Sequence, residues 1–181
     1  MLADLPVAVQ SLAEFPGAPE VVEDGRTYRE NALKKAWSAA KFTSKPALAD
    51  DTGLEVEALG GRPGLYAARF AGEGCTFADN IKMLLRLLDG VPPQRRGARF
   101  VCVLALVDPG GREQVVEGEL HGLITEAPAG CGGFGYDPVF YVPEMGKTLA
   151  ELTPGEKNRI SHRGRALAKV REILRTRNAE R

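Results

Sequence analysis

Two adjacent carboxylates, Asp50 and Asp51, end an apolar stretch and are followed by a hydroxyl residue, Thr52, and by Gly53. Open α/β sheets place ligands at the carboxyl ends of their strands, so this position suits a binding site. Paired carboxylates supply the hard oxygen ligands that Mg²⁺ prefers. An aspartate-rich turn, in which Asp51 caps neighbouring backbone, explains the same residues equally well. The segment alone leaves a magnesium site and a structural turn open.

A glycine-rich run over residues 130–138 carries two aromatic residues, Phe134 and Tyr136, beside Asp137. Its spacing matches G-x-G-x-x-G, but a dinucleotide fingerprint needs a helix that opens at the glycines, and here Pro138 begins an apolar stretch. Glycine amides can approach a ligand closely, and an exposed aromatic face can hold a flat base. A plain glycine-rich loop accounts for the glycines but not for the aromatics. The run therefore predicts a base-binding loop and not a Rossmann site.

Three cationic or titratable residues, Lys157, His162 and Arg163, lie just before and at the start of the last expected helix, for which Ser161 is a suitable N-cap. The positive end of a helix binds phosphate or keto oxygens. Because the same dipole disfavours cations at this end, these residues are expected to serve a ligand rather than the helix.

The elements that must position these segments alternate between helical and strand patterns. Helices are predicted over 27–42, 76–89 and 161–176, and strands over 47–50, 54–57, 98–107 and 113–120. Thr27 and Glu30 have the spacing of a capping box. With frequent turns and no repeat, the pattern is typical of one compact domain over residues 1–181, of a mixed α/β class.

The composition limits the kinds of partner. Lysine plus arginine and aspartate plus glutamate both number 24, so no global charge attracts nucleic acid or an anionic membrane. The cysteines at 75, 102 and 131 lack C-x-x-C spacing, which predicts buried, reduced thiols rather than disulfides or zinc ligands. No apolar stretch approaches the roughly 18 residues of a membrane span, and no signal peptide pattern opens the chain. A cytoplasmic protein is expected.

Taken together, these segments resemble the family of inosine/xanthosine triphosphate pyrophosphatases. The resemblance runs from about Glu23 to Ala168 through the segments Thr27–Ala36, Leu48–Leu54, Gly64–Arg69, Phe134–Phe140, Ala150–Leu152 and Glu156–Leu167. It implies an elongated mixed α/β fold with a long central sheet and two lobes flanking a nucleotide cleft, usually in a homodimer. It also implies that water attacks the α-phosphorus of ITP, dITP or XTP and releases pyrophosphate, with Mg²⁺ as cofactor.

The resemblance implies a role for each residue of the acidic segment. Asp51 would orient or deprotonate the attacking water and, with Asp50 and Glu30, would hold the metal ion. Glu30 also fits the capping box, and its surroundings favour the metal role. Thr52 would contact the substrate where many relatives have serine, which keeps the hydroxyl group.

The remaining candidates would hold the nucleotide. Lys35 and Lys157 would neutralise phosphate charge, with Lys34 as an alternative to Lys35. His162 and Arg163 would read the base edge, because their donors are satisfied by a six-oxygen and left unpaired by adenine. Each unpaired donor costs about 1–3 kcal/mol, so two give a discrimination on the order of 10². The base and sugar would be held by Phe134, Gly135, Tyr136 and Asp137.

The start of the chain departs from the family pattern. Family members begin with a strand and a Ser/Thr-x-Asn-x-x-Lys phosphate loop, whereas this chain is expected to begin near the tail of the first helix. A catalytically impaired, nucleotide-binding homodimer is therefore the alternative to an active enzyme. An RNA-binding module is disfavoured, because no patterned basic patch joins the last helix to the aromatic loop.

Overall fold

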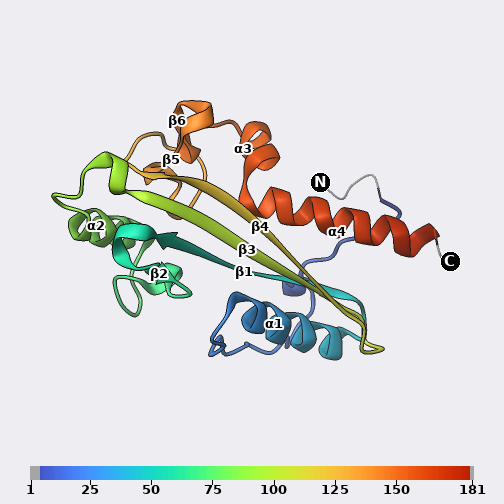
Figure 1. Cartoon of the computed structure of the whole chain (residues 1–181). Coiled ribbons are helices and arrows are strands. Elements are labelled where there is room, and N and C mark those ends of the chain that lie inside the picture. Colours follow the sequence, from blue (N-terminus) through green and yellow to red (C-terminus); the bar gives the residue numbers. More distant parts are fainter. Residues whose placement is uncertain (1–4, 180–181) are drawn as a thin grey trace. The chain divides into compact units, whose positions relative to one another are not determined.

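The computed structural model describes residues 5–179 and places four α-helices and one six-stranded sheet among them (Figure 1). The helices are α1 (Tyr28–Thr43), α2 (Phe77–Leu87), α3 (Pro154–Ile160) and α4 (His162–Ala179). The strands are β1 (Ala47–Val56), β2 (Pro63–Gly64), β3 (Gly97–Val107), β4 (Glu113–Ile124), β5 (Phe140–Val142) and β6 (Lys147–Thr148). The sheet order is β2-β1-β3-β4-β5-β6, and the mixed α/β class is confirmed.

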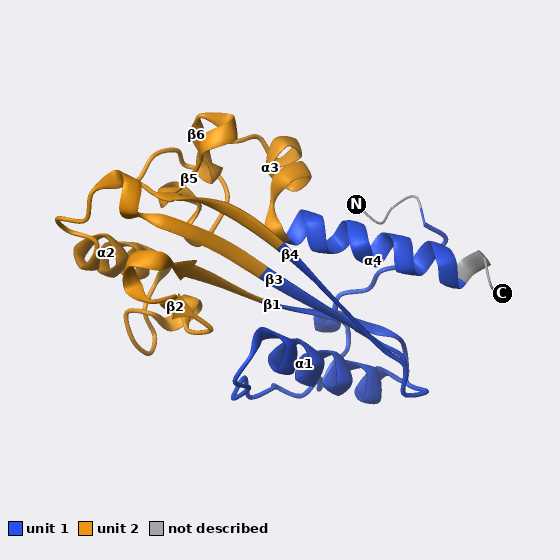
Figure 2. Ribbon diagram, in the orientation of Figure 1, with its two compact units in different colours: residues 1–51, 102–118, 163–181 blue, residues 52–101, 119–162 orange. Residues whose placement is uncertain are grey.

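The chain divides into two compact units (Figure 2). Unit 1 comprises residues 1–51, 102–118 and 163–181, and unit 2 comprises residues 52–101 and 119–162. The three long strands β1, β3 and β4 contribute residues to both units. The assignment of residues 1–181 to a single domain stays a prediction.

Within unit 1, α1 and α4 lie on opposite sides of the strands (Figure 2). On α1, Ala32, Ala36 and Ala40 are fully buried, and such small side chains let the helix approach the sheet closely. On the other side, Ala166 and Val170 of α4 pack against residues of β3. Each face of these strands is therefore covered by one helix, which decides what an inward side chain can contact.

The helix α1 begins one residue later than expected, at Tyr28, with Thr27 as its N-cap. The Thr27 side chain accepts a hydrogen bond from the Glu30 N–H (3.1 Å). The Glu30 carboxylate accepts from the Arg26 N–H (2.7 Å) rather than from the Thr27 N–H, so the expected reciprocal capping box is only half formed. The first turn of α1 is thereby tied to the loop that precedes it.

The core of unit 2 is formed by α2 and strands of the sheet. Leu84 and Leu88 on α2 are fully buried, and Leu54 and Phe140 of the sheet belong to the same cluster. The Phe77 side chain of the same helix is 42% exposed. It stands at the first turn of α2, where only one side of the helix faces the core.

The largest difference between the expected and the observed elements is in β1. Two short strands were predicted over 47–50 and 54–57, whereas Ala47–Val56 is continuous. Aspartate and glycine are depleted in strands, so Asp50, Asp51 and Gly53 suggested a break. In the structure β1 lies between β2 and β3. Its pairing with β2 is at Leu54 and Glu55, beyond the aspartates, and its other neighbour is the long strand β3. The two aspartates therefore lie within a strand and not at its carboxyl end.

A second correction concerns the segment before α4, where the short helix α3 was not predicted. Its signals were in the sequence, because Thr153 caps it with Glu156 in a capping box and Pro154 occupies its first turn. Lys157 therefore lies on α3, and not beside the N-terminus of α4. The strand β4 also runs four residues beyond its expected end, to Ile124.

The three cysteines differ in exposure, which corrects the expectation that all are buried. Cys102 is buried in β3, Cys75 is half-buried, and Cys131 is exposed. All three are unbridged, as expected. In residues 5–179, no helix has the length and the apolar character needed to cross a membrane.

Candidate functional site

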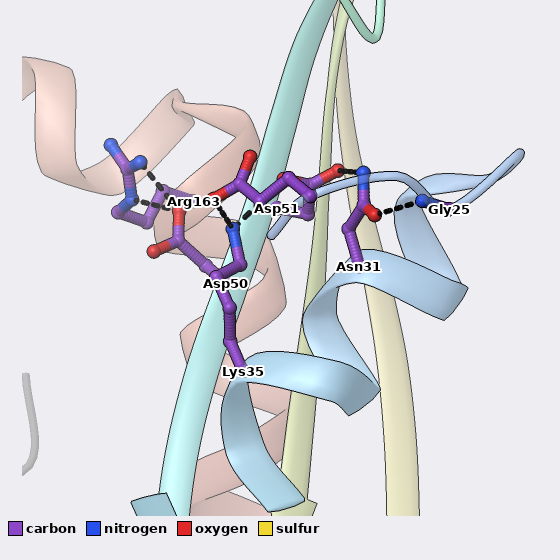
Figure 3. Close-up of polar contacts among 7 residues, drawn as sticks. Gly25, Asn31, Lys35, Asp50, Asp51 and Arg163 are labelled. Atoms are coloured by element: carbon purple, nitrogen blue, oxygen red, sulfur yellow. Dashed lines mark hydrogen bonds and ion pairs between the residues drawn. The ribbon is translucent and has the colours of Figure 1, made fainter. Parts of the chain in front are cut away.

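Asp51 is the centre of a polar cluster in unit 1. Its side chain is only 9% exposed, and one carboxylate oxygen, Oδ1, lies 2.9 Å from the Lys35 Nζ. The other oxygen, Oδ2, accepts a hydrogen bond from the Asn31 Nδ2 at 3.3 Å (Figure 3). Each oxygen of this carboxylate therefore has its own donor.

The geometry of α1 and β1 explains this arrangement. Asn31 and Lys35 are four residues apart on α1, so their side chains lie on the same face one turn apart. Successive side chains of a strand point to opposite faces of the sheet, so Asp50 faces the other way. Its Oδ2 accepts from the Arg163 Nη2 (2.6 Å) and Nε (3.3 Å), at the start of α4. The two neighbouring aspartates thus contact different helices (Figure 3).

Burial and the neighbouring charges shift the pKa values of Asp51 and Lys35 in opposite directions. Burial raises the pKa of Asp51, and although the Lys35 and Asn31 hydrogen bonds lower it, the net shift is upward. Burial alone lowers the pKa of Lys35, but the hydrogen bonds and charges of Asp51 and Glu23 outweigh it and raise the pKa. The lysine is therefore held firmly in its charged form, next to a carboxyl group that takes up a proton more readily than usual.

The structure separates the two candidate lysines. Lys35 contacts both Asp51 and Glu23, each at 2.9 Å from its Nζ. Lys34 instead pairs with the exposed Asp24. Lys35 is thus the lysine that α1 presents to the buried carboxylate. Glu23 was not among the expected site residues, since nothing in its sequence neighbourhood points to chemistry.

The carboxylates of this cluster can be compared with what Mg²⁺ requires. The ion prefers hard oxygen ligands, keeps several waters and is commonly held by one or two carboxylates together with substrate phosphates. Asp51 supplies such oxygens, whereas Asp50 points to the other face of β1 and contacts Arg163, and Glu30 accepts from the Arg26 N–H. Within residues 5–179, no group of three or more histidine, cysteine, aspartate or glutamate side chains converges. The donor chemistry fits Mg²⁺ held with help from a phosphate ligand.

In unit 2, a second polar cluster gathers on the glycine-rich loop. The buried Asp137 carboxylate accepts hydrogen bonds from the Lys157 Nζ and from the Phe134 N–H, the latter at 2.7 Å. The Lys157 Nζ lies 4.5 Å from the centroid of the Phe134 ring, which is itself exposed. A Cβ at Gly133 would lie 2.0 Å from the Asp137 Oδ2, and its φ of +72° favours glycine. The loop is therefore folded around Asp137 and presents Phe134 outward.

Tyr136 does not have the exposed position that its sequence context suggested. Its side chain is 2% exposed, and its hydroxyl donates to the Ala67 carbonyl at 2.9 Å. The Tyr136 ring meets the Phe77 ring edge-on, with 6.1 Å between centroids. Burial raises the pKa of Tyr136, which keeps the hydroxyl neutral. Gly135 has a φ of +65°, which turns the chain between the exposed Phe134 and the buried Tyr136.

His162 opens α4 and is buried, at 4% exposed. Its ring stacks on Phe100 of β3, with 4.6 Å between centroids and 17° between planes. Phe100 was expected only as part of a core strand, and a sequence contains no signal for such a long-range ring contact. Thr52 is half-buried in β1, directly after Asp51. Of the expected residues, Asp50, Asp51, Lys35 and Arg163 gather in unit 1, and Phe134, Gly135, Tyr136, Asp137 and Lys157 in unit 2.

Comparisons with known proteins all relate this chain to one family, and each covers most of its length. The sequence model of the Ham1 family matches residues 1–173. A dITP/XTP pyrophosphatase of Geobacillus kaustophilus is 58% identical over 166 residues, covering 92% of this chain and 81% of that relative. One of Geobacter sulfurreducens is 53% identical over 174 residues, covering 96% and 87%. The solved structure of a HAM1 protein from Coxiella burnetii has a TM-score of 0.90 and 43% identity, covering 97% of this chain and 89% of that one.

Proposed function

Because the chain belongs to the Ham1 family, we propose that it hydrolyses purine nucleoside triphosphates with a deaminated base, namely ITP, dITP and XTP. The products are the monophosphate and pyrophosphate. The relatives from Geobacillus kaustophilus and Geobacter sulfurreducens support this substrate class, since both are named dITP/XTP pyrophosphatases. The observation that carries the chemistry is the buried Asp51 carboxylate with Lys35 and Asn31 on its two oxygens.

In the proposed reaction, Asp51 orients a water molecule and accepts its proton. The water oxygen bonds to the α-phosphorus, and the bond from this phosphorus to the bridging oxygen breaks, so pyrophosphate leaves. An upward-shifted pKa suits a base that must both hold and release a proton. Before substrate binds, Lys35 stabilises the ionised carboxylate, and its Nζ then has phosphate oxygens as new partners. Lys157 is proposed to neutralise phosphate charge in the same way.

Mg²⁺ is the proposed cofactor. Asp51 would hold the ion with help from a phosphate ligand, and the bound ion would neutralise phosphate charge and lower the pKa of water. The assignment of Asp50 and Glu30 to the same ion stays a prediction. Asp50 has the Arg163 guanidinium as its partner, and this contact orients Arg163 on the first turn of α4. A homodimer in the cytoplasm also stays a prediction.

The nucleoside is proposed to be recognised by the glycine-rich loop and by the residues that open α4. The exposed Phe134 ring offers a face for a flat base, as base–aromatic stacking requires. Gly135 and Asp137 hold the shape of the loop, and Tyr136 supports it from the core. Thr52 is proposed to contact the substrate through its hydroxyl group.

A pyrophosphate-release panel tests the function. With Mg²⁺ present, we expect ITP, dITP and XTP to be cleaved at least about 10²-fold more efficiently than ATP, the discrimination that two unpaired donors allow. Excess chelator should abolish the release. Orthophosphate in place of pyrophosphate would contradict the proposal. Tight nucleotide binding without turnover would instead favour the catalytically impaired homodimer.

Replacing Arg163 with alanine tests recognition of the base. The Arg163→Ala variant is expected to lose kcat/KM for ITP by roughly tenfold or more while its weak use of ATP changes little, because only the six-oxygen accepts from the guanidinium. The ratio of the two kcat/KM values measures the effect. An equal loss of kcat/KM for both nucleotides would show that Arg163 binds the phosphates, or that it only stabilises the structure around Asp50.

A further inference from the structure

Asn31 is a buried amide that contacts Asp51 but takes no chemical step in the proposed reaction. It is 3% exposed on the first turn of α1. Its Nδ2 donates to the Asp51 Oδ2 at 3.3 Å, and its Oδ1 accepts from the Gly25 N–H at 2.8 Å (Figure 3). The amide therefore joins the loop before α1 to the carboxylate on β1.

The two partners determine which way the amide points. The Gly25 N–H can only donate, so it requires the amide oxygen, and the Asp51 carboxylate when ionised can only accept, so it requires the amide nitrogen. The reversed orientation would place donor against donor and acceptor against acceptor. Because the amide has one favourable orientation, its nitrogen is held toward Asp51.

The close approach of Gly25 keeps the amide in this place. A Cβ at residue 25 would lie 2.4 Å from the Asn31 Oδ1 and 2.9 Å from the Glu30 Cβ. The φ of Gly25 lies outside the left-handed region, so the backbone itself would accept alanine. Glycine is required here for space, and the space it leaves is filled by the Asn31 amide.

We propose that Asn31 is a positioning residue that holds the Asp51 carboxylate in its reactive orientation during turnover, with Gly25 as the group that fixes the amide. This inference rests on the proposed function. Lys35 holds the other carboxylate oxygen, but a charged lysine is drawn toward phosphate when a triphosphate binds. Asn31 is neutral, buried and anchored at its far end, so its contact with Asp51 persists when Lys35 changes partner.

The test compares Asn31→Ala and Asn31→Asp with wild type. The aspartate keeps the shape and can still accept from Gly25, but it replaces the donor to Asp51 with a like charge. We expect kcat for ITP to fall on the order of 10- to 100-fold in both variants, the scale for a misplaced catalytic group. The KM and the Kd for a non-hydrolysable ITP analogue should change by less than about threefold, because substrate contacts remain.

A matched control is available in unit 2. Asn80 is fully buried on α2, and its side chain bonds to the Ala71 N–H, to the Ala67 and Ala68 carbonyls and to the Cys75 thiol. The Asn80→Ala variant should lower the melting temperature but keep kcat per folded molecule within about twofold, because it leaves Asp51 untouched. Equal kcat losses in the Asn31 and Asn80 variants would reduce the role of Asn31 to stability and overturn the inference.

Gly25→Ala provides a second variant should Asn31→Ala fold poorly. It should lower kcat as Asn31→Ala does, and the double variant should lose little more, because the alanine methyl acts by displacing the Asn31 amide. Fully additive losses would overturn the proposed connection. Normal kcat in both Asn31 variants of an active enzyme would overturn the positioning role alone. A wild-type protein that releases no pyrophosphate from any triphosphate would overturn the proposed function, and this inference with it.

Discussion

The Asp51→Asn variant is expected to lose kcat for ITP by roughly 10²-fold or more, as for an enzyme that loses its general base or metal-bound water. Asparagine keeps the size of the side chain, so α1 and β1 should pack as before. An amide cannot accept the proton of the attacking water, and it is a weaker ligand for Mg²⁺. Nucleotide binding should persist, because the contacts of Lys157 and Phe134 are untouched.

The matched control for this change is Asp24→Asn. Asp24 is an exposed carboxylate of the loop before α1 and pairs with Lys34 rather than with Lys35, so its loss should leave turnover within about twofold of wild type. Pyrophosphate release and calorimetric binding of a non-hydrolysable ITP analogue measure the two properties separately. If Asp51→Asn turns over at a near-normal rate, Asp51 has no part in the chemistry.

Replacing Lys35 with methionine should lower kcat/KM for ITP by roughly 10²-fold, the usual scale for removing a group that stabilises transition-state charge. Methionine keeps the unbranched stem but provides no charge for Asp51, Glu23 or phosphate. The Lys35 hydrogen bond and charge lower the pKa of Asp51, so their loss raises it. Because the base acts when ionised, the acid limb of the pH–rate profile should move to higher pH.

The neighbouring Lys34→Met variant is the control for Lys35→Met. Lys34 is the other lysine of the same turn, but it pairs with Asp24 and not with Asp51. Its rate and its pH profile should both match those of wild type. Similar losses in the two lysine variants would mean that a general positive charge on α1, rather than the contact with Asp51, supports the reaction.

Much of the fold could be predicted because its signals are local. Thr27 and Thr76 stand at the starts of α1 and α2, where each side chain accepts from the N–H three residues on. The apolar run at residues 100–107 likewise predicted β3, and the strand predicted over 113–120 corresponds to most of β4. The predictions failed where a local rule was overridden, as at Asp50 and Asp51, which continue β1 beside the long strand β3. The partner of a strand lies far away in the sequence, so a stretch of about ten residues does not indicate which strand it will pair with.

The candidate site shows the same division between local and long-range information. Residue type and spacing identify Asp51, Lys35 and the glycine-rich loop as candidates. The resemblance of these segments to one family implies the reaction. Glu23, Asn31 and Phe100 did not stand out, because their importance lies in contacts with residues 12 to 62 positions away. Sequence also could not show that Tyr136 is buried while Phe134 is exposed, two residues apart.

The sequence by itself thus determined the fold class, the family and the groups able to do chemistry, since these depend on residue type, periodicity and order along the chain. The tertiary structure decided which groups meet. The alternation of β1 turns Asp51 toward α1 and Asp50 toward α4, and the space beside Gly25 lets the Asn31 amide reach Asp51. Contacts of this kind follow from packing in three dimensions, which brings together side chains that no local pattern relates.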